Sequence, residues 1–179
     1  VLGLDGSRTR TINVANAVFG NQNNKSVTTT TGTGLESTHR LDLNNDGRNE
    51  KVETAVTNLD GSLTQTEIDY KLDGTLRQKE VVVTSSVVQQ HGTTLERDSN
   101  GDGINDHFET SWIDKSGALV NTVWDTAANG TLKSRMLVTT SDDGRSKTVQ
   151  IDANGDGIVD ASQTTVGVLN ADGSRSHTV

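Results

Sequence analysis

The sequence predicts an all-β protein made of tandem repeats. Turns centred on glycine recur at Gly6, Gly61, Gly117 and Gly173, at spacings of 55, 56 and 56 residues. The segments between them are rich in Thr and Val, alternate mostly with a period of two residues and lack helical periodicity. A fixed period of this length is typical of repeat architectures. We therefore expect repeats over residues 1–60, 61–116 and 117–172, with the start of a further repeat over 173–179.

Each repeat is expected to contain four antiparallel strands. In the second repeat, glycines divide the chain at Gly61, Gly74, Gly92 and Gly103. Asp-Gly and Asn-Gly pairs supply the positive φ angles that hairpin turns need. The segments between such turns predict about a dozen strands in all, among them residues 51–58, 62–72, 75–84, 107–113, 118–124 and 131–140.

The composition leaves little material for a hydrophobic core. Hydrophobic residues make up 30% of the chain, aromatic residues make up 3%, and the mean hydropathy is −0.55. These values lie near those of disordered proteins, and without cysteine no disulfide can compensate for a thin core. The net charge of −8 argues against nucleic acid and anionic membranes as partners. No apolar run is long enough to predict membrane insertion.

An acidic twelve-residue pattern occurs once in each expected repeat. It begins at Asp42, Asp98 and Asp152, and side-chain oxygens stand at its first, third, fifth and ninth positions. Glycine stands at the sixth position, where a loop around a small cation must turn sharply, and a carboxylate at the twelfth position would complete the oxygen shell. One such cluster could be a simple turn, but three at matching positions favour metal binding. We expect three Ca²⁺ sites.

The expected ligands include the backbone carbonyl of the seventh residue in each loop. In the first two loops they are Asp42, Asn44, Asp46, Arg48, Glu50 and Glu53, then Asp98, Asn100, Asp102, Ile104, Asp106 and Glu109. In the third loop they are Asp152, Asn154, Asp156, Ile158 and Asp160. Glu50 has a longer arm than the aspartate of the other loops and would bind directly or through water. Gln163, at the twelfth position of the third loop, is neutral, so Asp160 should matter more there.

The loops resemble those of known calcium-binding repeats. Residues 152–160 read DANGDGIVD, which is similar to the short acidic loops of thrombospondin type 3 repeats and of FG-GAP propeller blades. The flanking segments lack the amphipathic helices that an EF-hand requires. Over its whole length, with NADGSR and NGDG signatures, the chain resembles the Thr-rich tandem repeats of giant calcium-binding surface proteins that bacteria secrete by a type I-like route. This resemblance implies an extracellular location at the cell surface or in a biofilm matrix, and no catalytic residues.

Two architectures fit a four-stranded repeat of this length. One is an elongated array in which the sheet continues from repeat to repeat, and the other is a β-propeller with one blade per repeat. The long, polar segments favour the array. We therefore expect a calcium-stiffened structural segment of a secreted surface, adhesin or extracellular filament protein. The alternative is a carbohydrate- or protein-binding module, propeller-like and braced by calcium. The first and last segments match each other, so neighbouring repeats or copies joined end to end are the expected partners, and extracellular polysaccharide or the cell surface is also considered.

The remaining residues do not predict an enzyme. The histidines are scattered, without metal-ligand spacing or a nucleophile nearby, at positions His39, His91, His107 and His177.

The two tryptophans flank the turn at Gly117. A two-residue hairpin loop at residues 115–116 would pair Trp112 with Leu119. Trp124 would then pair with His107 on the opposite face of the sheet. We expect both indoles to serve in packing, with an aromatic platform for sugar as the alternative.

Overall fold

The computed structural model describes residues 1–16, 22–86, 92–169 and 175–179, which contain β-strands and no helix. The thirteen strands are β1 (Arg8–Asn16), β2 (Gln22–Thr30), β3 (Glu36–Asp42), β4 (Lys51–Thr57), β5 (Leu63–Tyr70), β6 (Leu76–Thr84), β7 (Thr93–Asp98), β8 (His107–Ile113), β9 (Leu119–Thr126), β10 (Leu132–Thr140), β11 (Ser146–Asp152), β12 (Ala161–Leu169) and β13 (Arg175–Thr178). The described residues therefore include no helix of the length and apolarity that crossing a membrane requires. The predicted turn at Gly173 and the histidine at position 91 (His91) lie outside the described residues.

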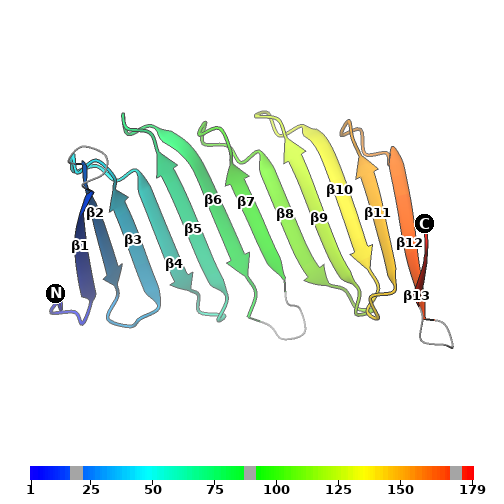
Figure 1. Ribbon diagram of the computed structural model, residues 1–179, viewed down its shortest axis with the longest axis horizontal. Helices are drawn as coiled ribbons and strands as arrows, with labels where there is room; N and C mark the ends of the chain where they lie inside the picture. The colour runs from blue at the N-terminus through cyan, green and yellow to red at the C-terminus, as the bar shows by residue number, and fades with distance from the viewer. Residues whose placement is uncertain (17–21, 87–91, 170–174) are drawn as a thin grey trace. The chain divides into compact units, whose positions relative to one another are not determined.

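Within each unit, the strands are hydrogen-bonded in the order in which they occur in the chain (Figure 1). The described pairs are antiparallel, from β1–β2 onward. The predicted all-β class is confirmed. Strands at corresponding places in the order begin about a repeat length apart, at Arg8 (β1), Leu63 (β5), Leu119 (β9) and Arg175 (β13).

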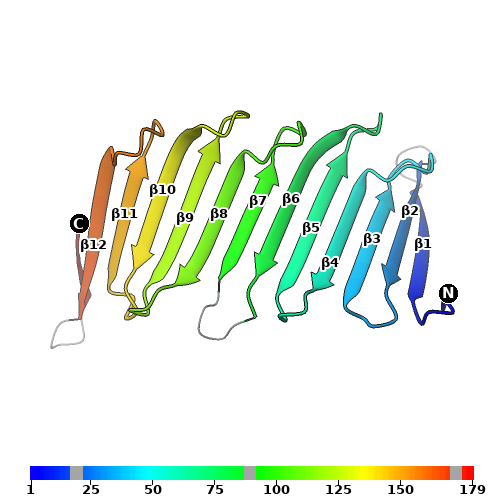
Figure 2. The same cartoon turned by 180° about the vertical axis from the view of Figure 1, so that it is seen from behind.

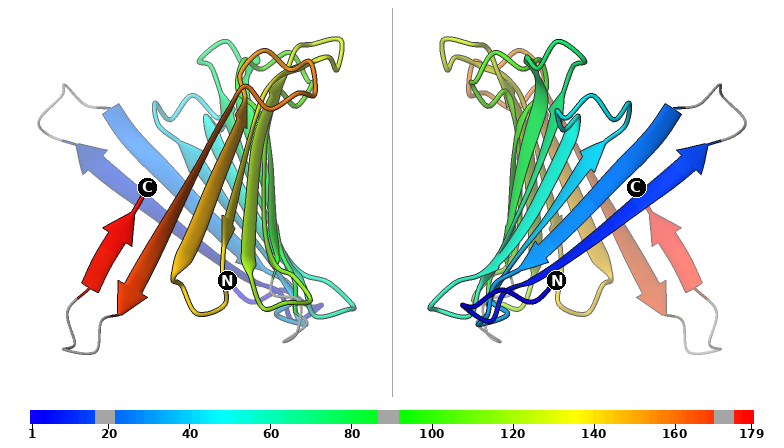
Figure 3. Two further views of the ribbon diagram at one scale, coloured as in Figure 1. Left: turned by 90° about the vertical axis from the view of Figure 1, so that its right-hand side faces the viewer. Right: turned by 90° about the vertical axis from the view of Figure 1, so that its left-hand side faces the viewer.

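The chain divides into two compact units. The first comprises Val1–Ser86 with Arg97–Ile104, and the second comprises Val87–Glu96 with Asn105–Val179. Within each unit the strands make contacts only with their neighbours in the chain. Neither face of the sheet is covered by a helix or a second sheet in the described parts of either unit (Figures 2 and 3).

Almost no hydrophobic side chain is buried. Among the described residues, only Ala118 and Val120 reach full burial, at 6% and 8% exposure. Stability must therefore come mainly from the backbone hydrogen-bond ladder and from side chains paired across neighbouring strands. This agrees with the thin core expected from the composition.

Strand pairing continues across the expected repeat boundaries. In the first unit β4 pairs with β5, from Lys51 opposite Asp69 to Thr57 opposite Leu63. In the second unit β8 pairs with β9, and β12 with β13. Propeller blades are separate sheets, so hydrogen bonding would stop at these boundaries. The pairing gives no support to the propeller alternative.

The hairpin loop at Gly117 is one residue longer than the two-residue loop considered above. In the β8–β9 loop, the amide of Asp114 donates to the carbonyl of Ala118 (2.9 Å), and Gly117 has a φ of 84°. Three residues thus lie between the last paired positions, as in a type I turn followed by a glycine bulge. The loop between β4 and β5 has the same hydrogen bonds, from Asn58 to Ser62.

The longer loop changes which residues face each other. Phe108 lies opposite Trp124, and Trp112 lies opposite Val120. The conditional pairing of Trp112 with Leu119 and of Trp124 with His107 is wrong by one residue, because the third loop residue shifts the register. Since directly opposed residues share a face of the sheet, both tryptophans lie on the same face.

Aspartates in the hairpin loops lock the turns by hydrogen bonds. Asp60 Oδ1 accepts from the hydroxyl (2.6 Å) and the amide (2.9 Å) of Ser62. Asp114 accepts the same two bonds from Ser116, and Asp73 from Thr75. The pKa of each of these carboxyls lies below its ordinary value of 3.8. The hydrogen bond from the hydroxyl is the largest cause, and that from the amide is the next largest.

Acid should weaken these turns. A carboxyl with a lowered folded pKa stabilises the fold above its unfolded pKa, and the contribution is lost as the pH falls through the folded pKa. Below about pH 4 the wild type should lose more thermal stability than a variant carrying Asp60→Asn, Asp73→Asn and Asp114→Asn, which keeps the acceptor oxygens but does not titrate there. Melting followed by circular dichroism at about pH 5 and pH 3 measures the difference. Parallel curves would show that the turn carboxylates do not contribute.

Candidate metal centre

The loop between β3 and β4 brings three carboxylates together. Oxygens of Asp42, Asp46 and Glu50 all lie within 4.8 Å of one another, and the group could hold a metal ion. Asp42 and Glu50 are buried, at 3% and 7% exposure, and Asp46 is exposed. Glu50 Oε2 accepts from the amide of Leu43 (2.6 Å), so its longer arm is folded back over the start of the loop.

One oxygen of Asp42 has no hydrogen-bond partner. Asp42 Oδ2 accepts from the amide of Gly47 (3.0 Å). Asp42 Oδ1 is buried and unpartnered, and the only other such side-chain atom in the described part of the chain is Thr122 Oγ1. A buried, unpaired carboxylate oxygen is costly, and two further carboxylates close by add repulsion. A bound cation would offset both costs.

The third, fifth and seventh residues of this loop are connected by short hydrogen bonds. Asn44 Oδ1 accepts from the amide of Asp46 (3.0 Å), and Asp46 Oδ1 accepts from the amide of Arg48 (2.8 Å). The pKa of Asp46 lies below 3.8, mainly because its carboxylate accepts from the amide of Arg48 and next because it accepts from the side chain of Asn44, so the group stays ionised. The Arg48 guanidinium donates to the carbonyl of Asp73 (3.2 Å) in the β5–β6 turn, so this loop is fixed to the next hairpin.

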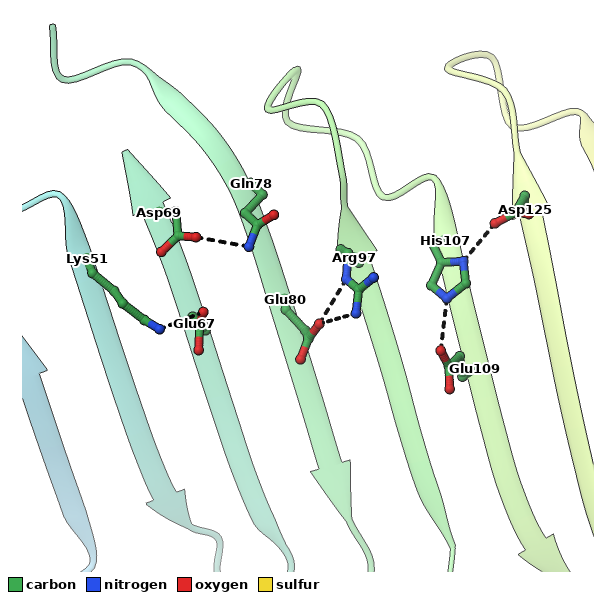
Figure 4. A network of polar contacts seen from close by, with 9 residues as sticks. All are labelled: Lys51, Glu67, Asp69, Gln78, Glu80, Arg97, His107, Glu109 and Asp125. Atoms are coloured by element: carbon green, nitrogen blue, oxygen red, sulfur yellow. Dashed lines mark hydrogen bonds and ion pairs between the residues drawn. The ribbon is translucent and has the colours of Figure 1, made fainter. Parts of the chain in front are cut away.

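Glu53, the expected twelfth ligand, is not part of this group. It lies on β4, where its carboxylate pairs with His39 Nδ1 (3.0 Å) and with Lys51 Nζ (3.0 Å). Both hydrogen bonds lower the pKa of Glu53, and the bond from His39 has the larger effect. Lys51 also contacts Glu67 (2.8 Å; Figure 4), and its pKa is raised, first by Glu67 and then by Glu53. β4 begins at Lys51, so Glu53 stands within the sheet and not in the loop, and its role as a twelfth ligand stays a prediction.

In the second loop, the residues Asp98–Ile104 repeat this hydrogen-bond pattern. Asp98 is 1% exposed and accepts from the amides of Gly101 (2.6 Å) and Gly103 (2.7 Å). Asn100 Oδ1 accepts from the amide of Asp102 (2.8 Å), and Asp102 Oδ1 from the amide of Ile104 (2.8 Å). These residues belong to the first unit.

The two other expected ligands of that loop, Asp106 and Glu109, belong to the second unit. Glu109 lies on β8 and is bonded to His107 Nε2 (3.0 Å), whose Nδ1 is bonded to Asp125 (2.7 Å; Figure 4). Burial lowers the pKa of His107, but the bonds to Glu109 and Asp125 together raise it above 6.5. Glu109 therefore takes part in a cross-strand cluster on the sheet.

The third loop closes in the same way as the first. Asp152 is 5% exposed and accepts from the amides of Gly155 (2.7 Å) and Gly157 (2.8 Å). Asp160 Oδ2 accepts from the amide of Ala153 (2.7 Å), as Glu50 does from that of Leu43. The ninth residue therefore folds back onto the second in both loops.

The third, fifth and seventh residues of the third loop make the same hydrogen bonds as those of the other two loops. Asn154 Oδ1 accepts from the amide of Asp156 (2.9 Å), and Asp156 Oδ1 accepts from that of Ile158 (2.8 Å). Gln163 is exposed on β12, outside the loop.

The fourth residue distinguishes the first loop from the other two. Gly101 and Gly155 have φ angles of 77° and 74°, and a Cβ on either would overlap the backbone carbonyl of Leu76 or Leu132 respectively. Their amides occupy an oxygen of the first aspartate. Asn45 replaces glycine in the first loop, with a φ of 57°. This is the loop in which the first aspartate keeps an unpartnered oxygen, a distinction that ligand spacing alone did not predict.

Comparison with known proteins found no relative of this chain. No family model matches the chain, and no curated protein matches its sequence.

Removing Asp42 should abolish one metal site. Asp42→Ala deletes the buried carboxylate at the centre of the group and should reduce the number of Ca²⁺ ions bound in calorimetric titration by about one. Gln163→Ala is the matched control, because that side chain is exposed on a strand and should leave the count unchanged. An equal count in the wild type and in Asp42→Ala would rule out Asp42 as a ligand.

Proposed function

We propose that the chain is a calcium-stiffened structural segment of a secreted bacterial surface, adhesin or extracellular filament protein. The observation that carries this proposal is the group of Asp42, Asp46 and Glu50, whose oxygens lie within 4.8 Å of one another around a buried, unpartnered oxygen of Asp42. The ions act on the loops that join the strands, and the strands supply the length of the segment.

Calcium suits the donors better than other common metals. The first loop offers carboxylate oxygens from Asp42, Asp46 and Glu50 and an amide oxygen from Asn44, without nitrogen or sulfur ligands. Hard oxygen donors of this kind favour Ca²⁺, whereas imidazole and thiolate favour zinc and copper. A loop of consecutive turns also suits the flexible, high coordination number of Ca²⁺ better than the strict octahedron of Mg²⁺.

Metal binding would supply stability that this sheet otherwise lacks. Only Ala118 and Val120 are buried apolar residues in the described part of the chain. An ion that binds only the folded state stabilises it by about 2.7 kcal/mol at a concentration roughly 100 times Kd. Against a total stability of about 5–15 kcal/mol for an ordinary domain, a few such sites decide whether the chain folds.

The acidic residues on the face of the sheet support a structural role. Glu53, Glu67 and Glu80 lie directly opposite one another on β4, β5 and β6 and line a hollow of about 430 Å³. Two carboxylates near a hollow can serve acid–base catalysis, but these are paired with cations: Lys51 bridges Glu53 and Glu67, and Arg97 donates two bonds to Glu80 (2.8 and 2.6 Å; Figure 4). The pairs connect neighbouring strands, so we assign them to cohesion of the sheet and propose no enzymatic activity.

The proposed extracellular location rests on the resemblance of the chain to secreted calcium-binding repeats. Neighbouring repeats, or copies joined end to end through β1 and β13, are the proposed partners, because these strands come first and last in the strand order. Strands at such positions present backbone groups that another strand can use, and on β1 those of Arg8 and Thr9 already pair with Leu2 and Val1.

Calcium removal should unfold the protein. In excess chelator, like charges in each loop lose their counter-ion, and circular dichroism should show a largely disordered chain. Ca²⁺ added to about 1–10 mM should restore the β spectrum, whereas Mg²⁺ at the same concentration should restore much less. A full β spectrum in chelator, unchanged by calcium, would contradict the proposal.

A further inference from the structure

The two tryptophans of the chain lie on one face of the sheet in the second unit. Trp112 is on β8 and Trp124 on β9, and the sequence contains no other tryptophan. Trp124 stacks on Phe108, with ring centroids 5.1 Å apart and planes inclined by 5°. In a chain with 3% aromatic residues, three of them are thus concentrated on two neighbouring strands.

Between the indoles the surface forms a hollow of about 400 Å³, here termed the tryptophan hollow. Its lining residues are Thr110, Trp112, Thr122, Trp124, Leu132 and Arg135. Its volume is within the range of small-molecule sites, about 300–1,000 Å³. Trp112 is 38% exposed, so one side of the hollow offers an accessible indole.

One residue that lines the hollow carries a polar atom without a hydrogen-bond partner in the described part of the chain. Thr122 is 5% exposed, and its Oγ1 is buried without a hydrogen-bond partner. Leaving such a hydroxyl unsatisfied costs about 1–3 kcal/mol. Because Oγ1 is buried, a ligand hydroxyl can supply the missing hydrogen bond only after the Thr122 side chain turns toward the hollow.

Arg135 supplies a charged donor at the same place. It lies opposite Trp124 and is exposed, and no ion pair or hydrogen bond engages its guanidinium among the described residues. Its other cross-strand neighbour, Asp152, accepts bonds from the amides of Gly155 and Gly157. The guanidinium therefore remains available for a ligand.

The fold itself does not require these aromatic residues. In the first unit, Val52 lies opposite Ile68 where Phe108 lies opposite Trp124 in the second, and Val56 occupies the place of Trp112. The threonines of the hollow have counterparts in Thr54 and Thr66, which also oppose each other. Equivalent strands thus pair in the same register with aliphatic residues, and packing alone does not explain the tryptophans.

We propose that the tryptophan hollow binds a pyranose ring of a glycan. The C–H face of such a ring stacks on an indole, while its hydroxyls accept from Arg135 and exchange a hydrogen bond with Thr122 Oγ1. A protein partner fits less well, because peptide strands add to sheet edges through backbone groups, and a packed second sheet needs a broad apolar face. Here the same face continues into polar residues, including Thr139, Thr148 and Gln150.

Tryptophan fluorescence tests this directly, since both indoles line the hollow. The wild type in calcium is titrated with a neutral probe, a β-1,4-linked glucose hexasaccharide, and with an acidic probe, a tetragalacturonate. We expect a saturable change for at least one probe, and the preferred probe shows whether Arg135 meets a hydroxyl or a carboxylate. Trp124→Ile, which installs the residue of the first unit, should weaken binding of that probe at least tenfold.

Matched threonine variants separate binding from folding. Thr122→Val removes the unpartnered hydroxyl and should weaken binding several-fold, whereas Thr66→Val makes the same change in the first unit and should leave binding unaltered. Circular dichroism and calcium stoichiometry verify that each variant is folded. Failure of both probes to bind the folded wild type, or equal effects of Thr122→Val and Thr66→Val, would overturn the proposal while leaving the calcium sites unaffected.

Discussion

A sheet with water on both faces has to be stabilised without a hydrophobic core, and this constraint governs the rest of the structure. The first aspartate of each acidic loop provides the stabilising contact that recurs most regularly along the chain. Asp42, Asp98 and Asp152 are each at or below 5% exposure, although the apolar residues next to them in the sequence are half-buried or exposed. Each accepts amides of its own loop, so the most buried groups are carboxylates that fix the ends of strands. Such burial is favourable only with hydrogen bonds and opposite charge nearby.

The faces of the sheet follow the same principle. Lys51, Glu53 and Glu67 form one cross-strand cluster in the first unit, and His107, Glu109 and Asp125 form another in the second. Exposed ion pairs individually contribute only about 0–1 kcal/mol. Here the ion pairs help to fix the register of neighbouring strands, because a one-residue slip would move every partner to the opposite face of the sheet.

The sequence was sufficient for the fold class and for the location of the acidic loops, because both depend on local patterns. Glycine spacing and two-residue alternation predict strands and turns without any knowledge of tertiary contacts. Pairing across strands, in contrast, decides features that a local pattern does not contain. Glu53 fits a ligand spacing taken from loops that lead into helices, but here it belongs to a strand and pairs with His39. Likewise, one additional residue in the Asp114–Ala118 turn placed Trp112 and Trp124 on the same face. The unpartnered oxygens of Asp42 and Thr122 depend on side-chain packing, which no local pattern contains.

The pairing of each strand only with its chain neighbours has a consequence for how the protein folds. Contacts join residues that are close in sequence, such as Thr57 with Leu63 and Ile113 with Leu119. Low contact order reduces the loop entropy lost before contacts form and is associated with fast folding. Each new hairpin can add to the strands already in place, with no need for a distant segment. Such a chain can acquire structure progressively from one end, in step with its emergence from a ribosome or a narrow channel.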